Sequence, residues 1–248
     1  MVTNATTQRL CLWCGPLMAL VFFIGFGLIA RFIPPPNPAL NAADIAALYR
    51  GRSIPIRIGM QLSMWAGVLC VPWVIAVGLQ MKRIEGRVAP LAYLQIGLGI
   101  LLPLEFIVPL YFFQTAAYRA DRPAEVVQAL NDLGWLPFTG LVYTVVAQAV
   151  VFGIAALADT HATPVFPRWA GYFSIWCGLL MAPASLDVFF TNGPLAWNGA
   201  IAWWVLLVAF FVWLIGLTVV TFQAISSGQM ECSAHRTEPT IGSRAAER

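Results

Sequence analysis

The sequence predicts an all-α integral membrane protein with six transmembrane helices and two short interfacial helices. Of the 248 residues, 60% are hydrophobic and only 10% are charged, whereas about a quarter of the residues of a soluble domain carry charge. A helix needs about 20 apolar residues to cross a bilayer. Six stretches reach this length, and they cover residues 12–33, 58–81, 91–113, 138–158, 169–190 and 200–225. We expect them to form a single transmembrane domain over residues 1–225.

Prolines interrupt several of these stretches. They are Pro16, Pro72, Pro103, Pro109 and Pro183. A proline lacks a backbone N–H and disturbs the preceding helical turn. In lipid, neighbouring helices or local changes of helix type satisfy the freed carbonyl groups. We therefore expect these prolines to bend the spans without ending them.

Two loops on one side of the membrane share a pattern that predicts a short helix on the membrane surface. In residues 41–50, Asn41 is a helix N-cap and Asp44 suits the positive end of the helix. In residues 123–133, a proline begins an apolar stripe, which Gly134 is expected to stop. Both segments are too short to cross the bilayer. The third loop on that side has the sequence Thr-Asn-Gly-Pro at residues 191–194, which predicts a turn without such a helix.

The distribution of basic residues orients the predicted bundle. With both termini in the cytoplasm, the inner segments carry eight lysine and arginine residues and the outer segments carry six; three of the eight lie in residues 82–87. Cytoplasmic loops are enriched in these residues. Thirteen of the 14 basic residues are arginine, a bias typical of high-GC bacterial genomes. We expect a protein of the bacterial cytoplasmic (inner) membrane with both termini inside, and a disordered cytoplasmic tail at residues 226–248.

Two acidic residues lie within apolar spans. Glu105 follows Pro103 by two residues near the middle of the third span, and Asp187 lies near the end of the fifth. Charged side chains at such depth are costly, and they are most often functional. We expect Glu105 to face the bundle interior as a proton donor, a proton carrier or a hydrogen-bonded core group. Its candidate partners, which are also candidate ligand contacts, are Gln61, Gln148, Tyr111 and Tyr143.

Several other chemistries lack support in the sequence. The two histidines, His161 and His235, have no companions at metal-ligand spacing, so no metal site and no cofactor are expected. Cys11 and Cys14 form a Cys-x-x-Cys pattern, but they open a span instead of following a strand as in redox domains. The sequence shows neither a glycine-rich phosphate loop nor a basic patch with interleaved aromatic residues. These features argue against nucleotide hydrolysis and nucleic-acid binding.

The segment Pro103-Leu104-Glu105-Phe106 resembles the Pro-x-Glu-Glu stretch of the small membrane-embedded lycopene cyclases. The resemblance implies that Glu105 is a general acid that protonates a polyene, with Phe106 standing where the second acid would be. The chain also resembles uncharacterised six-span inner-membrane families of high-GC bacteria, through residues 80–86 (QMKRIEG) and 167–172 (PRWAGY). This second resemblance implies the fold and leaves the activity open.

Three functions are compatible with these residues. We favour a binding protein or accessory subunit that accommodates a lipid or another apolar small molecule, with Glu105 and Asp187 as polar contacts. A membrane partner subunit is compatible with this function. The alternative is an acid-assisted membrane enzyme of the cyclase or isomerase type, acting on an isoprenoid-like substrate with the same two acids as catalytic groups. The third is a proton-coupled transporter, since proline-interrupted spans often line transport sites.

Overall fold

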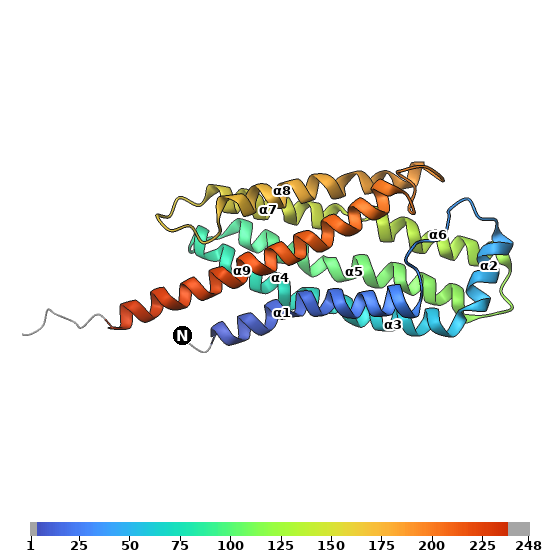
Figure 1. The fold of residues 1–248 in the computed structure, drawn as a ribbon, viewed down its shortest axis with the longest axis horizontal. Helices are drawn as coiled ribbons and strands as arrows, with labels where there is room; N and C mark the ends of the chain where they lie inside the picture. The colour runs from blue at the N-terminus through green and yellow to red at the C-terminus, as the bar shows by residue number, and fades with distance from the viewer. Residues whose placement is uncertain (1–3, 238–248) are drawn as a thin grey trace, which may run out of the picture.

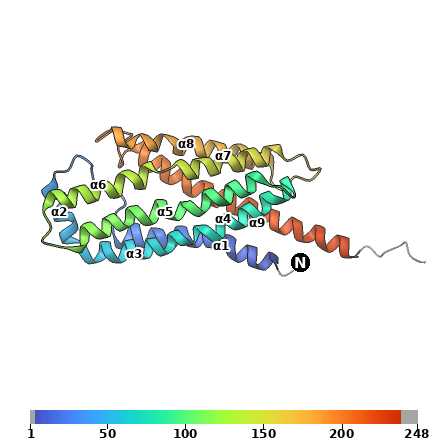
Figure 2. The same ribbon diagram turned by 180° about the vertical axis from the view of Figure 1, so that it is seen from behind.

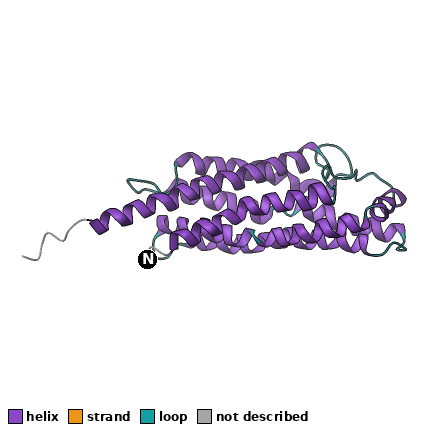
Figure 3. Cartoon of the chain, turned by 60° about the horizontal axis from the view of Figure 1, so that its bottom comes forward, coloured by secondary structure: helices purple, strands orange, loops and turns teal. Residues whose placement is uncertain are grey.

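Six long helical rods form the bundle in the computed structural model, which describes residues 4–237 and the side chains of residues 5–229. Each rod is long and apolar enough to cross a membrane. The candidate spans are Ala5–Ile29, Ser53–Glu85, Pro90–Tyr118, Ala124–Ala158, Arg168–Phe189 and Ala200–Gln229. The described part of the chain consists of helices and loops (Figure 1, Figure 3). The prediction of an all-α, multi-pass membrane protein with six spans is confirmed.

Most of the rods are built from more than one helical piece. In chain order the pieces are α1 (Asn4–Phe22), η1 (Phe23–Ile29), α2 (Ala42–Gly51), α3 (Ser53–Val68), α4 (Cys70–Glu85), α5 (Pro90–Tyr118), α6 (Ala124–Gly140), α7 (Tyr143–Ala158), α8 (Arg168–Met181), η2 (Ala182–Phe189), η3 (Ala200–Val205) and α9 (Leu206–Thr237). The segments η1 and η3 are π-helical and η2 is a 3-10 helix. Pro16, Pro103 and Pro109 lie inside α-helices. Pro72 lies just after the change from α3 to α4, and Pro183 lies where α8 changes to η2. None of the five prolines ends its candidate span, as predicted.

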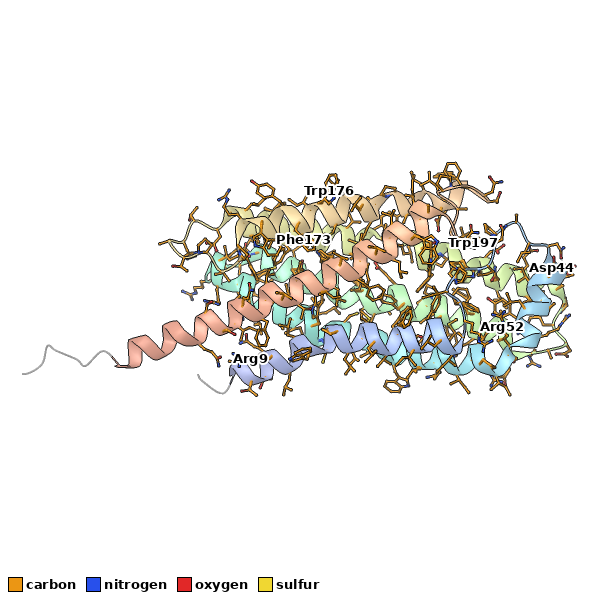
Figure 4. All side chains as sticks on the ribbon, in the orientation of Figure 1. Arg9, Asp44, Arg52, Phe173, Trp176 and Trp197 are labelled. Carbon is orange, nitrogen blue, oxygen red and sulfur yellow. The ribbon has the colours of Figure 1, made fainter. Side chains whose placement is uncertain are left out.

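The two ends of the bundle differ. The first described residues, the far end of α9 and the segment at residues 82–87 share one end (Figure 1). There Arg9 on α1 donates hydrogen bonds to Ser226 and Gln229 on α9, at 3.1 and 2.8 Å. At the opposite end, the indole N–H of Trp197 donates to the carbonyl of Pro36 at 2.9 Å (Figure 4). Which end faces the cytoplasm stays a prediction.

The first predicted interfacial helix is present as α2. The Asn41 side chain caps it by accepting the backbone N–H of Asp44 at 2.9 Å, as its sequence predicts. Figure 1 shows α2 lying across the end of the bundle, roughly perpendicular to the rods.

The prediction of a second short interfacial helix at residues 123–133 is wrong. Residues 124–133 are helical, but they begin α6, which runs along the bundle and leads into α7 within one candidate span, Ala124–Ala158. Gly134 does not end the helix, which continues to Gly140. Instead, the glycine leaves space for the Phe113 ring. A Cβ atom at position 134 would lie 2.2 Å from that ring. The adjacent Trp135 is fully buried among aromatic side chains, so tertiary packing extends the helix.

The C-terminal helix also extends further than the sequence predicts. Residue 225 is not its end, since α9 continues to Thr237. Ser226 and Gln229, which belong to the expected tail, bond Arg9. The last part of that tail, residues 238–248, lies outside the described residues.

The core of the bundle is rich in aromatic rings on the side of α2. Their centroids form a connected network with separations of 5.0 to 6.5 Å, through Phe22, Phe26, Phe32, Phe106, Phe113, Trp135, Phe138 and Trp203. Figure 2 shows α5 running through the bundle between α3–α4 and α6–α7, and it packs against all four. The helix that bears Glu105 is therefore central.

Candidate functional site

Glu105 lies at the middle of α5 and is half-buried. The hydroxyl of Thr144 donates a hydrogen bond to its Oε1 atom. Pro109 lacks the N–H that would bond the backbone carbonyl of Glu105 in a regular helix, so the backbone here is perturbed as well. The prediction that Glu105 faces the interior next to a polar group is confirmed. None of the four predicted partners bonds Glu105 among the described residues, because Thr144 takes that place.

Thr144 is positioned by an interruption between α6 and α7. Residues 141 and 142 are not helical, and Tyr143 begins α7 in the middle of the span. No side chain caps the start of this helix. A helix N-terminus presents unpaired N–H groups and a partial positive charge. The carboxyl of Glu105 therefore lies beside the N-terminus of α7, whose partial positive charge favours a negatively charged group.

A cavity of about 70 Å³ lies next to Glu105. Its walls come from α1, α5, the α6–α7 interruption, η3 and α9. Besides Glu105, the lining residues are Phe22, Leu102, Phe106, Phe138, Leu141, Val142, Val145, Trp203, Leu206, Leu207, Phe210 and Phe211. We call this space the Glu105 cavity. A water molecule requires about 10–15 Å³ of such space, so the cavity admits several water-sized groups or the tip of a larger molecule.

One wall of the Glu105 cavity carries a polar atom without a partner. Trp203 is 2% exposed, and its indole N–H makes no hydrogen bond to any described residue. Buried indole N–H groups usually find an acceptor, and leaving one unpaired costs about 1–3 kcal/mol. The cavity is thus lined by two polar residues, Glu105 and a tryptophan with an unpaired indole N–H, and its other walls are apolar.

The structure places Asp187 in a different setting. Asp187 lies in η2 and is fully buried. Its Oδ2 atom accepts a hydrogen bond from Thr139, whereas Oδ1 has no partner among the described residues. Gly140 leaves space for this carboxyl, since a Cβ atom there would lie 2.6 Å from Oδ1. Asp187 does not line the Glu105 cavity, so the two acids do not share this pocket. Along the chain, their partners Thr139 and Thr144 lie before and after the α6–α7 interruption.

The remaining candidate residues are distributed over three places. Gln61 and Tyr111 line a surface groove between α3 and α5. Gln148 is fully buried on α7 and accepts a 3.4 Å hydrogen bond from Gln95. Tyr143 is 63% exposed, although its neighbour Thr144 bonds Glu105. Their roles as ligand contacts stay predictions.

Sequence reasoning missed Thr139, Thr144 and Trp203. A signal was present in the sequence of residues 138–144, Phe-Thr-Gly-Leu-Val-Tyr-Thr. Two threonines flank a glycine there at the centre of an apolar region, and threonine is often an interhelical hydrogen-bonding group in membranes. The pairing of each threonine with an acid depends on the helix interruption, which this pattern alone does not specify.

A scan against protein-family models and searches of curated proteins and of solved structures find no match to this chain. Its function is therefore argued from the geometry of the site.

Proposed function

We propose that this multi-pass membrane protein binds an apolar small molecule whose single polar group, a hydroxyl or a carbonyl, enters the Glu105 cavity. The observation that carries the proposal is that Glu105 and Trp203, whose buried indole N–H has no partner among the described residues, line the same aromatic-walled cavity. Known ligand sites have the same composition, with mostly apolar walls and a few polar groups that fix orientation.

The chemistry of the cavity selects this class of ligand. The Trp203 N–H can donate only, so it suits an oxygen atom of the ligand. Glu105 accepts a hydrogen bond from a hydroxyl when it is ionised and donates one to a carbonyl when it is neutral. Because a polar group buried without a partner loses several kcal/mol of hydration, these two contacts favour a molecule with one oxygen function on a hydrocarbon body. The cavity volume of about 70 Å³ limits the buried part to that polar tip.

A cavity-filling variant tests the proposal. Leu207 lines the cavity, whereas the next residue, Val208, is 59% exposed on the outside of α9. We expect Leu207→Trp to reduce binding of farnesol, an isoprenoid alcohol, at least about 10-fold, and Val208→Trp to leave it unchanged. Native mass spectrometry in mild detergent measures both, with a C15 hydrocarbon as the control ligand. Equal binding by the two variants, or no preference for the alcohol over the hydrocarbon, would reject the proposal.

Acid-assisted catalysis is a second candidate, supported by the rings that surround the acid. The faces of aromatic rings stabilise cations, and Phe106 and Phe138 line the cavity beside Glu105. In this hypothesis Glu105 is the sole acid at the site, because Asp187 lies elsewhere. Glu105→Gln separates the two functions, since an amide retains hydrogen bonding without a transferable proton. Retained farnesol binding is expected for either function, and the absence of any polyene product from the native chain supports a binding protein. Loss of an isomerised or cyclised polyene product, with binding intact, supports the enzyme.

A further inference from the structure

A second candidate site lies on the outside of the bundle, between α3 and α5. It is an open groove of about 870 Å³, which we call the α3–α5 groove. Arg57 and Tyr118 lie at its end nearest α2, Gln61 and Gln114 lie midway, and Trp65 lies at the far end. The groove lies within the volume range of small-molecule sites, and no function has been assigned to it above.

Two arginine side chains lie near one tyrosine ring at the α2 end of the groove. The guanidinium carbon of Arg57 is 5.3 Å from the centroid of Tyr118, and that of Arg119 is 5.7 Å from the same centroid. Among the described residues, neither arginine has a carboxylate oxygen within 4.0 Å. Two cations near the same ring, neither paired with a carboxylate, favour the binding of an anion at this end of the groove.

More positive charge lies beside this pair. An adjacent depression contains Arg31 and Arg52, and it shares Ile54 and Ile58 with the α3–α5 groove. Figure 4 shows Arg52 at the α2 end of the bundle. Tyrosine and tryptophan residues are common at the depth of the lipid headgroups, so this rim is placed to meet lipid phosphates.

The spacing along α3 matches the parts of a glycerophospholipid. Three lining residues of α3 follow one another at four-residue intervals, namely Arg57, Gln61 and Trp65. Each lies about one helical turn, or 5.4 Å, further from α2 than the one before it. Gln114 donates to the backbone carbonyl of Arg57 at 3.0 Å and to Oε1 of Gln61 at 3.2 Å. This arrangement leaves the amide N–H₂ of Gln61 available to an ester carbonyl one turn below the phosphate. Below it, Trp65 is 69% exposed and offers an apolar surface to an acyl chain.

We propose that the α3–α5 groove binds an anionic phospholipid of the adjoining leaflet. The phosphate binds at the end of the groove beside Arg57, with Arg119 adding positive charge nearby, an ester carbonyl accepts from Gln61, and an acyl chain runs along α3 to Trp65. An anionic headgroup is favoured over a zwitterionic one because the ammonium group of the latter would meet the same arginines. This site is independent of the Glu105 cavity.

A pair of double variants with the same loss of charge tests the assignment. The probe is phosphatidylglycerol, compared with phosphatidylcholine of the same acyl chains by native mass spectrometry in mild detergent. We expect the native chain to retain phosphatidylglycerol preferentially. Each arginine near a membrane surface changes binding about 5-fold, so Arg57→Gln with Arg119→Gln should lower retention of phosphatidylglycerol about 25-fold. Retention of phosphatidylcholine should change little.

The matched control removes two charges at the opposite end of the bundle, where Arg87 and Arg168 are exposed. Arg87→Gln with Arg168→Gln should leave retention of phosphatidylglycerol unchanged, and both double variants should keep the native melting temperature. Equal retention of the two lipids by the native chain would overturn the proposal, as would an equal loss in both double variants. Displacement of the lipid by millimolar glycerol phosphate would overturn the placement of its acyl chain in the groove.

Discussion

At the scale of single residues, two threonines hold the two intramembrane acids. Thr139 bonds Asp187 and Thr144 bonds Glu105, on either side of the α6–α7 interruption. In apolar surroundings a carboxyl that loses its partner has no water to replace it. Each pair therefore fixes a helix end and orients an acid at the same time.

Thr144→Val should lower the free energy of unfolding by about 1–3 kcal/mol, because valine keeps the shape of threonine and removes its donor. Thr144→Ser restores a hydroxyl and is expected to retain most of the stability. Thermal unfolding in mild detergent gives the comparison. If the valine variant is as stable as the native chain, the bond to Glu105 does not stabilise the fold.

The sequence predicts the depth and inward orientation of Glu105 because a carboxyl in a long apolar run has few tolerable positions. It does not predict Thr144 as the partner. Neighbours across helices depend on the rotation of α7, and that rotation is reset where the helix restarts at Tyr143. For the same reason the sequence does not show that Asp187 and Glu105 occupy separate sites.

At the scale of helices, close contacts between spans depend on glycine. On α5, a Cβ atom at Gly99 would lie 2.2 Å from Val74 of α4, whereas one at Gly97 would meet nothing within 4 Å. Small residues let membrane helices approach one another in this way.

Gly99→Ala should therefore destabilise the protein by about 1–3 kcal/mol through overpacking. Gly97→Ala on the same helix should be neutral or stabilising by up to about 1 kcal/mol, since alanine is the better helix former. Melting temperatures of the two variants in the same detergent provide the measurement. A destabilisation of equal size at both positions would show that helix propensity, and not packing against α4, decides the effect.

The loop between α7 and α8 is organised by Asp159. Burial raises the pKa of this carboxyl, but the backbone N–H groups of His161 and Val165, at 3.0 and 2.8 Å, and the ring of His161 outweigh burial. The pKa of Asp159 consequently lies below its usual value. A carboxyl with a lowered pKa in the folded state stabilises the protein above its unfolded pKa of about 3.9, and this stability is lost as the pH falls through the lower, folded value.

Asp159→Asn should reduce the free energy of unfolding at pH 7 by about 1–3 kcal/mol. The difference from the native chain is expected to shrink as the pH falls below about 4. Unfolding midpoints of both proteins between pH 3 and pH 7 measure it. A difference that stays constant over this range would contradict a role for the ionised carboxylate.

The spans themselves could be predicted from the sequence because the length of an apolar run is a local property. Their ends and their interruptions could not. Packing of the buried Trp135 accompanies the continuation of residues 124–133 into the longer helix α6. Beyond residue 225, Ser226 and Gln229 of α9 accept hydrogen bonds from Arg9 of α1. Both effects come from contacts between segments that are distant in the sequence.

At the scale of the whole molecule, both ends of the described chain lie on the same side as residues 82–87 (Figure 1). The positive-inside rule predicts that this side faces the cytoplasm. Val88 is 78% exposed at this end, and Ala120 is exposed at the other. Single cysteines at these positions in a cysteine-free background should react differently with an impermeant maleimide in intact bacterial cells. We expect labelling at position 120 only, and labelling at position 88 alone would invert the topology.

Photolabelling locates an apolar ligand within the bundle. A diazirine-bearing isoprenoid alcohol is bound to the purified protein, irradiated, and mapped by peptide mass spectrometry. Binding in the Glu105 cavity predicts adducts on Leu102, Phe106 and Phe210, all of which line it, and predicts their loss in Leu207→Trp. Adducts confined to exposed residues such as Leu101, Leu104 and Val208, with no change in Leu207→Trp, would show that the alcohol meets only the outside of the helices.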